Sequence, residues 1–361
     1  MRRYKVRVIS TLRRYATCLI WKGRLMKRLT IGTRASKLAM IQTHQVIERL
    51  QRYWPNLQIT IEQIHTVGDQ MKDAPLSKIG GDGVFVTEIE RALHEKRIDL
   101  AVHSLKDLPT TQPEGVRLII PGPREDVRDV FVSNGNLRPV LAEQFAGEHT
   151  KERYSQQELR IGTGSLRRMA QIRARFPGAQ LLPIRGNVDT RLRKLEAHEY
   201  DAIVLAAAGL YRLDMVERLT GRVVYLPIDI VMPAPGQGAL AIEMRDEPEM
   251  LELLLPLNDV VTQAATSAER MFMRRLGAGC FLPVAAYGEV VGETLMLRGL
   301  VISLDGQRQV RVQQSIRWTT EDALEEAELL GIKVAEQALE QGAREIIDSL
   351  LPTGERERLH A

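Results

Sequence analysis

The strongest constraint on this chain's fold is a regular alternation of short apolar runs with amphipathic stretches from Leu29 to about Ile230. Residues 29–31, 99–103 and 202–205 are of strand length, and the stretches that follow such runs have helical periodicity. Strands and helices that alternate at this spacing predict mainly parallel sheets covered by helices. We therefore expect an α/β fold.

Two segments rich in proline and glycine interrupt the alternation. Residues 121–123 (Pro-Gly-Pro) and 233–236 (Pro-Ala-Pro-Gly) are typical of turns, and we interpret both as crossovers between two lobes. A strand up to about Met244 is expected after the second crossover. The predicted boundaries are residues 29–122 with 236–256 for lobe 1, and residues 128–232 for lobe 2.

Beyond about residue 260 the pattern changes to strands that alternate apolar and polar residues. The three segments concerned are residues 285–291, 294–304 and 309–316. The Asp305-Gly306 pair between the last two is a strong hairpin signal. With a long amphipathic helix expected over residues 320–350, this predicts a small α+β third domain, residues 260–351, with a three-stranded antiparallel sheet.

Several helix ends are also predicted. Ser36 is a suitable N-cap for a helix that extends to about Tyr53. Residues 87–90 and 266–269 match the capping-box pattern, in which a threonine precedes a glutamate by three positions. The second of these helices is expected to stop at Gly277.

The charge of the chain is unevenly distributed. The formal net charge is +4, from 50 basic and 46 acidic residues, but residues 1–28 contain ten Lys/Arg and no Asp or Glu. From Leu29 onward, 40 basic residues face 46 acidic ones. A net-acidic body does not favour nucleic acid as a partner. No apolar run approaches the roughly 18–20 residues of a membrane span.

The basic N-terminal extension, residues 1–28, has three interpretations. It resembles an organellar transit peptide because it is Arg-rich and acid-free. It could bind an anionic surface. It could also be a mis-assigned start, since Met26 directly precedes the first strand. We favour the last, which predicts a cytoplasmic protein with a disordered or absent extension; a transit peptide would predict an organelle.

Only two cysteines are present, Cys18 in the extension and Cys280. There is no CxxC pair and no disulfide framework, so neither a structural zinc site nor any other metal site is predicted. Residues 277–283 (Gly-Ala-Gly-Cys-Phe-Leu-Pro) indicate a tight loop around Cys280. Such a thiol is either accessible to a ligand in a neighbouring cleft or an inert buried side chain.

Charged residues follow directly on two strands in the first half of the chain, and ligands bind beyond such strand ends in parallel α/β sheets. Arg34 and Ser36 would lie at a helix N-terminus that favours anions, or else form a capped helix with a solvated arginine. Lys106 and Asp107 suit acid–base work, or else form an exposed ion pair of little energetic value. His103, just before them, is interpreted as a satisfied core residue.

Two further strand ends lie in the second lobe. Residues 162–168 (Gly-Thr-Gly-Ser-Leu-Arg-Arg) form a turn into a helix that is suited to binding oxyanions, but match neither a Walker A loop nor GxGxxG. Residues 185–191 and Arg212 contribute more cations. Six arginines would therefore face one crevice: Arg34, Arg167, Arg168, Arg185, Arg191 and Arg212. Such a group predicts a polycarboxylate or polyphosphate ligand.

Together these segments resemble the porphobilinogen deaminase family, from Leu29 to about Leu351. The motifs that occur in that family's order and spacing are Arg34-Ala35-Ser36, residues 103–107, 162–168, 185–187 and 236–238, and Gly279-Cys280. Departures are Asp82, where many relatives carry a basic residue in the loop of residues 68–83 that we interpret as mobile, and Phe281, where a polar residue is more usual.

The resemblance implies two lobes like those of periplasmic binding proteins with a hinged cleft, and a third domain that carries the cofactor cysteine. It implies a dipyrromethane cofactor linked through a thioether to Cys280, onto which four porphobilinogen units are condensed with loss of ammonia. Water then releases hydroxymethylbilane. The implied partner is this small substrate alone, with no nucleic acid and no membrane, and we expect a monomer.

The resemblance also implies roles for individual residues. The implied catalytic residues are Asp107, Lys106 and Arg34, with Asp107 stabilising the cation left when ammonia departs. The implied cofactor-binding residues are Cys280, Lys106, Asp107, Thr163, Ser165, Arg167, Arg168, Arg185, Gly186 and Arg191. The implied ligands of the substrate carboxylates are Arg34, Ser36, Arg185, Arg191, Arg212 and Gln237.

Two alternatives come from other functional classes. A non-catalytic anion-binding protein of the same two-lobed architecture would explain the arginines but leave Cys280 and the third domain without a role. An enzyme acting on nucleic acids or phosphate esters predicts a carboxylate cluster for metal ions or a phosphate loop, and the sequence contains neither pattern.

Overall fold

The computed structural model describes residues 27–66, 86–135, 159–277, 282–320 and 323–350. The predictions on residues 1–26, on the loop of residues 68–83 and on Cys280 fall outside the described residues. Within the described part of the chain, no helix combines the length and the apolar character needed to cross a membrane.

Lobe 1 is built on a five-stranded sheet in the order β2-β1-β3-β10-β4. The strands are β1 (Arg28–Arg34), β2 (Gln58–Ile64), β3 (Leu100–Ser104), β4 (Val116–Ile119) and β10 (Leu240–Arg245). The strands β1, β2 and β3 are parallel, whereas β10 is antiparallel to both of its neighbours. The other elements are α2 (Lys37–Tyr53), α5 (Thr87–His94), α10 (Pro248–Leu254), and the 3-10 turns η1 (Leu105–Asp107) and η2 (Leu255–Leu257).

Lobe 2 repeats this topology in a sheet of order β7-β6-β8-β5-β9. Its strands are β5 (Asp129–Ser133), β6 (Arg160–Gly162), β7 (Gln180–Leu182), β8 (Ala202–Ala206) and β9 (Val223–Tyr225). Again three strands are parallel, and β5 is antiparallel to both neighbours. The helices are α7 (Leu166–Arg175), α8 (Val188–Glu196) and α9 (Ala207–Arg212).

In each sheet the antiparallel strand is the first one after the chain has crossed over from the other lobe. The crossovers, residues 120–128 and 226–239, correspond to the two Pro/Gly segments, and Gly122-Pro123 is a cis peptide. The crossovers bond to each other, since Gln237 Nε2 donates to Val127 O at 2.7 Å and Glu125 N donates to Gly238 O at 3.2 Å. Two similar sheets are therefore joined by a pair of cross-linked strands, and the α/β prediction is confirmed.

The third domain contains the predicted three-stranded antiparallel sheet, in the order β11-β12-β13. Its elements are α11 (Val260–Arg275), β11 (Val284–Val291), β12 (Thr294–Ile302), β13 (Gln309–Arg317), α12 (Ala323–Glu340) and α13 (Ala343–Asp348). The fully buried Phe272 of α11 packs against Gly299 of β12, where a Cβ atom would lie 2.5 Å from the ring. The small residue thus permits close contact between helix and sheet.

The turn between β12 and β13 contains the predicted Asp305-Gly306 pair, and Gly306 has a φ of +75°. This turn packs against α7 of lobe 2, and Ala170 of α7 shares an apolar cluster with Leu300 and Ile302 of β12. The helix predicted over residues 320–350 is wrong as a single element: it is two helices, separated at Gly342 with a φ of +94°.

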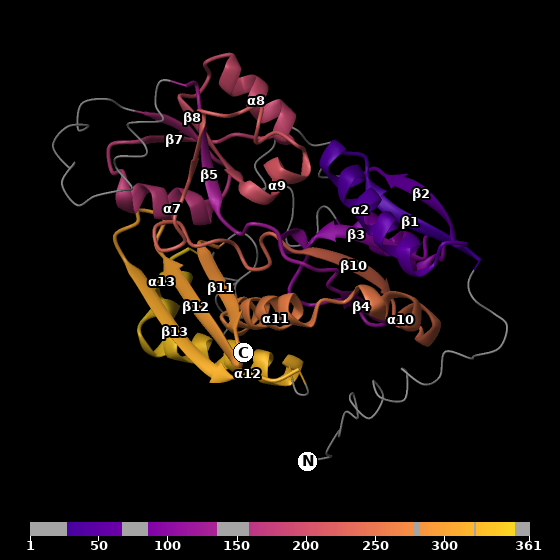
Figure 1. The fold of residues 1–361 in the computed structure, drawn as a ribbon. Helices are drawn as coiled ribbons and strands as arrows, with labels where there is room; N and C mark the ends of the chain where they lie inside the picture. The colour runs from indigo at the N-terminus through magenta and orange to yellow at the C-terminus, as the bar shows by residue number, and fades with distance from the viewer. Residues whose placement is uncertain (1–26, 67–85, 136–158, 278–281, 321–322, 351–361) are drawn as a thin grey trace.

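The three domains contact one another, as Figure 1 shows, with the two lobes side by side and the third domain against both. Lobe 1 also contacts lobe 2 directly, because Leu38 and Ile41 of α2 pack on the lobe-2 apolar cluster that contains Leu205 and Leu210. This contact brings the helix that follows β1 to the same region as the helices that follow the lobe-2 strands.

Candidate functional site

The predicted site residues of lobe 1 lie at the carboxyl ends of its central parallel strands. Arg34 is the last residue of β1, and Lys106 and Asp107 are in η1, which directly follows β3. Ser36 is the N-cap of α2 and accepts a hydrogen bond from Ala39 N at 3.3 Å. The predicted cap is confirmed, and the free end of this helix opens onto the strand ends.

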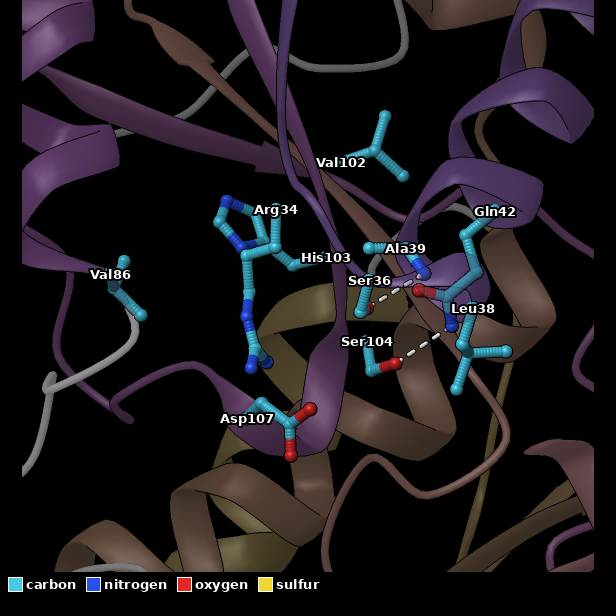
Figure 2. Close-up of a pocket in the computed structure, with 10 residues that line it drawn as sticks. All are labelled: Arg34, Ser36, Leu38, Ala39, Gln42, Val86, Val102, His103, Ser104 and Asp107. Atoms are coloured by element: carbon cyan, nitrogen blue, oxygen red, sulfur yellow. Dashed lines mark hydrogen bonds between the residues drawn. The ribbon is translucent and has the colours of Figure 1, made fainter. Parts of the chain in front are cut away.

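A small pocket opens at these strand ends, and Figure 2 shows its lining. Arg34 and Asp107 both line it, and in this view the Arg34 side chain extends toward Asp107. Gln42 Nε2 donates to Ser104 Oγ at 2.8 Å on the opposite wall. The pocket therefore presents a cation, an exposed carboxylate and neutral polar groups within a small space.

Behind the pocket, His103 has a buried partner. Its Nε2 lies 3.0 Å from Glu243 Oε2 of β10, and both side chains are almost fully buried. His103 is therefore buried in the core, as interpreted, but its Nε2 forms no regular hydrogen bond among the described residues, and the side chain also lines the pocket. Glu243 was not predicted from the sequence, because its partner is 140 positions away in the chain.

Lys106 connects the two lobes electrostatically. Its pKa is lowered to about 8, chiefly by burial and also by Arg168 and Arg167 of lobe 2, while Asp107 and Asp129 act in the opposite direction. Charges on lobe 2 are therefore close enough to influence a lobe-1 lysine. The lysine and the two arginines therefore lie near one another across the two lobes.

The lobe-2 side of the site begins with the anion-binding turn, residues 162–165, after β6. Ser165 is the N-cap of α7 and accepts from Arg168 N at 3.4 Å, and Thr163 Oγ1 accepts from Ser165 N at 3.3 Å. Thr163 is fully buried, whereas Gly164 is exposed. The predicted turn into a helix N-terminus is present.

The arginine pair, Arg167 and Arg168, lies in the first turn of α7 and is almost fully buried. Both side chains contact a single carboxylate that was not predicted, that of Asp129 at the start of β5. Arg168 Nη2 is 2.6 Å from Asp129 Oδ1, and Arg167 Nη2 is 2.8 Å from Asp129 Oδ2. An acidic residue inside an apolar strand segment, Asp129–Ser133, was the available sequence signal.

Arg191 and Arg185 complete the lobe-2 wall, from α8 and the loop before it. Arg191 Nε donates to Gly186 O at 2.8 Å, and Gly186 has a φ of +106°. The pKa of Arg191 is lowered to about 10, chiefly by burial and also by the positive charges of Arg168 and Arg185, while the negative charge of Asp107 of lobe 1 raises it. The structure thus brings Arg185 and Arg191 together with Arg168 and Asp107.

Two predicted carboxylate ligands are bound to the crossovers instead: Gln237 lies in the second crossover, and Arg212 is the last residue of α9. Gln237 is fully buried, and its Nε2 donates to Val127 O and to Asp129 Oδ1. Arg212 Nη2 donates to Gly238 O at 2.6 Å, and burial followed by Arg49 lowers the Arg212 pKa to about 10. Gln237 is fully buried among these partners, and its role toward a substrate carboxylate stays a prediction; Arg212 is bound to the backbone of the second crossover.

Comparison with known proteins gives matches over most of the chain. Residues 29–252 match the family model described as "Porphobilinogen deaminase, dipyromethane cofactor binding domain", and residues 264–340 match "Porphobilinogen deaminase, C-terminal domain". A porphobilinogen deaminase of Syntrophotalea carbinolica is 44% identical over 89% of this chain and 96% of that protein. One of Roseiflexus castenholzii is 44% identical over 88% of this chain and 98% of that protein.

Among solved structures, the periplasmic aliphatic sulphonate binding protein SsuA of Escherichia coli is similar at a TM-score of 0.35 and 14% identity. This similarity covers 69% of this chain and 70% of that one.

Proposed function

This chain belongs to the porphobilinogen deaminase family, and we propose which of its residues carry out that family's reaction. The chain is a transferase of tetrapyrrole biosynthesis that joins four porphobilinogen units head to tail, with release of ammonia, and then liberates hydroxymethylbilane by hydrolysis. Its cofactor is dipyrromethane. The roles of individual side chains below are proposals.

The residues of the lobe-2 wall fit a cofactor that bears carboxylates. Arg168 Nε is buried and has no hydrogen-bond partner among the described residues. Arg185 and Arg191 lie next to it, and the Ser165-capped end of α7 adds helix amides. When bound, dipyrromethane supplies an electron-rich pyrrole carbon as the nucleophile. We propose Arg168, Arg167, Arg185, Arg191, Gly186, Thr163 and Ser165 as the residues that hold it.

The substrate carboxylates are proposed to bind where the two lobes meet. Each porphobilinogen carries an acetate and a propionate, and a guanidinium donates two parallel hydrogen bonds to a carboxylate. Arg34 and Ser36 would bind from lobe 1, and Arg185 and Arg191 from lobe 2. The charged Lys106 ammonium, beside the arginine pair, would fix one more carboxylate.

Asp107 is the proposed catalytic carboxylate. It is exposed at the end of η1 and lines the same pocket as Arg34, so its oxygens can accept a hydrogen bond from a pyrrole N–H. A carboxylate at this place stabilises positive charge on the substrate as ammonia leaves. It can also take up the proton that the new carbon–carbon bond displaces. Arg34 would orient the substrate carboxylate and the Asp107 carboxylate relative to each other.

The observation that most supports this site is that lobe-1 and lobe-2 charges influence each other's pKa values. Lys106 is affected by Arg167 and Arg168, and Arg191 is affected by Asp107. An acid–base pair of lobe 1 and guanidinium groups of lobe 2 therefore lie close enough for their charges to interact. This is the arrangement that condensation of acidic substrates requires.

The attachment of the cofactor to Cys280 is tested by intact mass spectrometry of freshly purified protein. The wild type is expected to carry a covalent mass increase that corresponds to two linked pyrrole units. Cys280→Ser should lose this increase and all turnover, while Cys18→Ser, the matched control, should keep both. An adduct that persists in Cys280→Ser would contradict the assignment.

We further propose that the protein acts as a cytoplasmic monomer with no nucleic-acid or membrane partner. The acidic body of the chain from Leu29 onward supports the absence of a nucleic-acid partner. Size-exclusion chromatography with light scattering tests the oligomeric state, and a dimer mass would contradict this part of the proposal.

A further inference from the structure

The arginine pair is held by a carboxylate that lies outside the expected substrate-binding set. Asp129 is fully buried at the junction of the first crossover and β5. We propose that Asp129 is a positioning residue that fixes Arg167 and Arg168 in the orientation that receives a ligand carboxylate. Gln237 links these three side chains to the two crossovers, which form the hinge between the lobes. This inference rests on the proposed function and deepens it.

The geometry leaves each guanidinium only a limited set of free N–H groups. Each arginine uses one terminal nitrogen on Asp129, and the other is bound to the backbone: Arg167 Nη1 donates to Met232 O at 2.6 Å, and Arg168 Nη1 donates to Val204 O at 3.1 Å. Among the described residues, Arg168 Nε is left buried without a partner. Asp129 therefore determines which N–H remains for a ligand.

The charges lead to the same conclusion. Burial alone would raise the pKa of Asp129, but Arg167 and Arg168 together lower it well below its usual range, so the group is a carboxylate at working pH. One negative and two positive charges leave one net positive charge on the unit. Without Asp129, two guanidinium groups would be buried side by side with no counter-charge, which is strongly unfavourable.

The tether to the hinge comes from Gln237. Its Nε2 donates both to Asp129 Oδ1 at 2.9 Å and to Val127 O at 2.7 Å, so one amide joins the second crossover to the first and to the carboxylate. Arg124 Nε in turn donates to Gln237 O at 2.8 Å. A movement of the crossovers would therefore change the direction in which the guanidinium groups of Arg167 and Arg168 point.

Asp129→Asn tests the proposal, because it keeps the shape of the side chain and removes its charge. The matched control is Asp201→Asn, which disrupts an Asp–Arg pair with Arg160 at the opposite end of the lobe-2 strands. The measurements are KM and kcat for porphobilinogen, the fraction of chains with the covalent adduct, and the thermal midpoint.

We expect Asp129→Asn to raise KM about tenfold to a hundredfold and to lower the adduct fraction, since a small displacement of a positioning group has effects of this size. Asp201→Asn should retain the wild-type KM and adduct. A purely structural role would lower the thermal midpoint of Asp129→Asn but leave the KM of the folded protein unchanged, and that result would overturn the proposal.

Two further variants test the positioning role if Asp129→Asn does not fold. Asp129→Glu keeps the charge but displaces it by one methylene, and Gln237→Leu removes the tether while leaving both ion pairs. Each is expected to raise KM severalfold, and a wild-type KM in the variant that folds would refute the proposal. If wild type and Asp201→Asn themselves lack the adduct, the function fails instead, so the two failures are distinguishable.

Discussion

At the scale of single residues, Lys106 has an acid–base property that its neighbours create. A half-buried lysine beside two guanidinium groups loses its proton more easily, and its pKa falls from 10.5 to about 8. If its ammonium binds a substrate carboxylate, that contact is present below about pH 8 and is lost as the pH rises through this value. Affinity for porphobilinogen should decrease in the same range.

Replacing Lys106 with arginine separates the titration of Lys106 from that of other groups, because arginine stays charged between about pH 6.5 and 10. We expect kcat/KM of the wild type, measured between about pH 6.5 and 10, to fall on the alkaline side with a midpoint near 8. Lys106→Arg should lack that decrease, even if its absolute rate is lower. Identical alkaline limbs in both proteins would exclude Lys106 as the titrating group.

Asp107 is suited to an isosteric test because its side chain is exposed in η1. Asp107→Asn should therefore leave the thermal midpoint nearly unchanged, whereas turnover should fall by about a hundredfold to ten-thousandfold, as for loss of a general acid–base group. The control is Glu114→Gln, an exposed acidic residue in the following segment. Near-native turnover of Asp107→Asn would remove it from the mechanism.

The residues that the sequence predicted correctly are those defined by local pattern. Ser36 and Ser165 cap helices directly after strands, and both were visible as polar residues between an apolar run and a helical one. Asp129 and Glu243 were missed because their partners are 38 or more positions away. Nothing local distinguishes a buried carboxylate with a distant cation from an exposed one.

At the scale of elements, helices were easier to predict than their first residues. The capping-box pattern at residues 266–269 lies inside α11, which begins after the N-cap Asp259. Thr266 Oγ1 donates to Thr262 O instead of capping. Likewise α5 begins after Val86, which makes no side-chain cap. Both helices therefore have N-caps other than the predicted threonines, so these two capping predictions were wrong.

The break between α12 and α13 gives a test of backbone conformation alone. Gly342 has a φ of +94°, and a Cβ atom there would meet nothing within 4 Å. Gly342→Ala should therefore lower the free energy of unfolding by about 1 kcal/mol through left-handed strain alone, and Gly342→Asn by less. Chemical denaturation measures both. Equal stability of Gly342→Ala and wild type would mean that the two helices can merge without penalty.

At the scale of the whole molecule, the α/β class and the two crossovers were predicted from the strand–helix alternation and the Pro/Gly segments. What did not follow was how the third domain holds the lobes. Glu269 of α11 is fully buried and pairs with Arg124 of the first crossover at 2.7 and 3.0 Å. It also accepts from Gly236 N at 2.6 Å and from Gly288 N at 2.7 Å. One carboxylate thus joins both crossovers to the third domain.

The consequence is that the stability of the hinge should depend on this carboxylate far more than on other ion pairs of the same helix. Glu269→Gln leaves the Arg124 guanidinium without a counter-charge, and loss of one partner of a buried pair typically costs about 3–5 kcal/mol. Arg275 and Glu336 form the matched surface pair, 3.2 Å apart and half exposed, where Glu336→Gln should cost less than about 1 kcal/mol. Denaturation midpoints of both variants measure the difference. Equal midpoints would show that the hydrogen bonds between the two crossovers are enough to hold them. The third domain could then separate from the crossovers without loss of the fold.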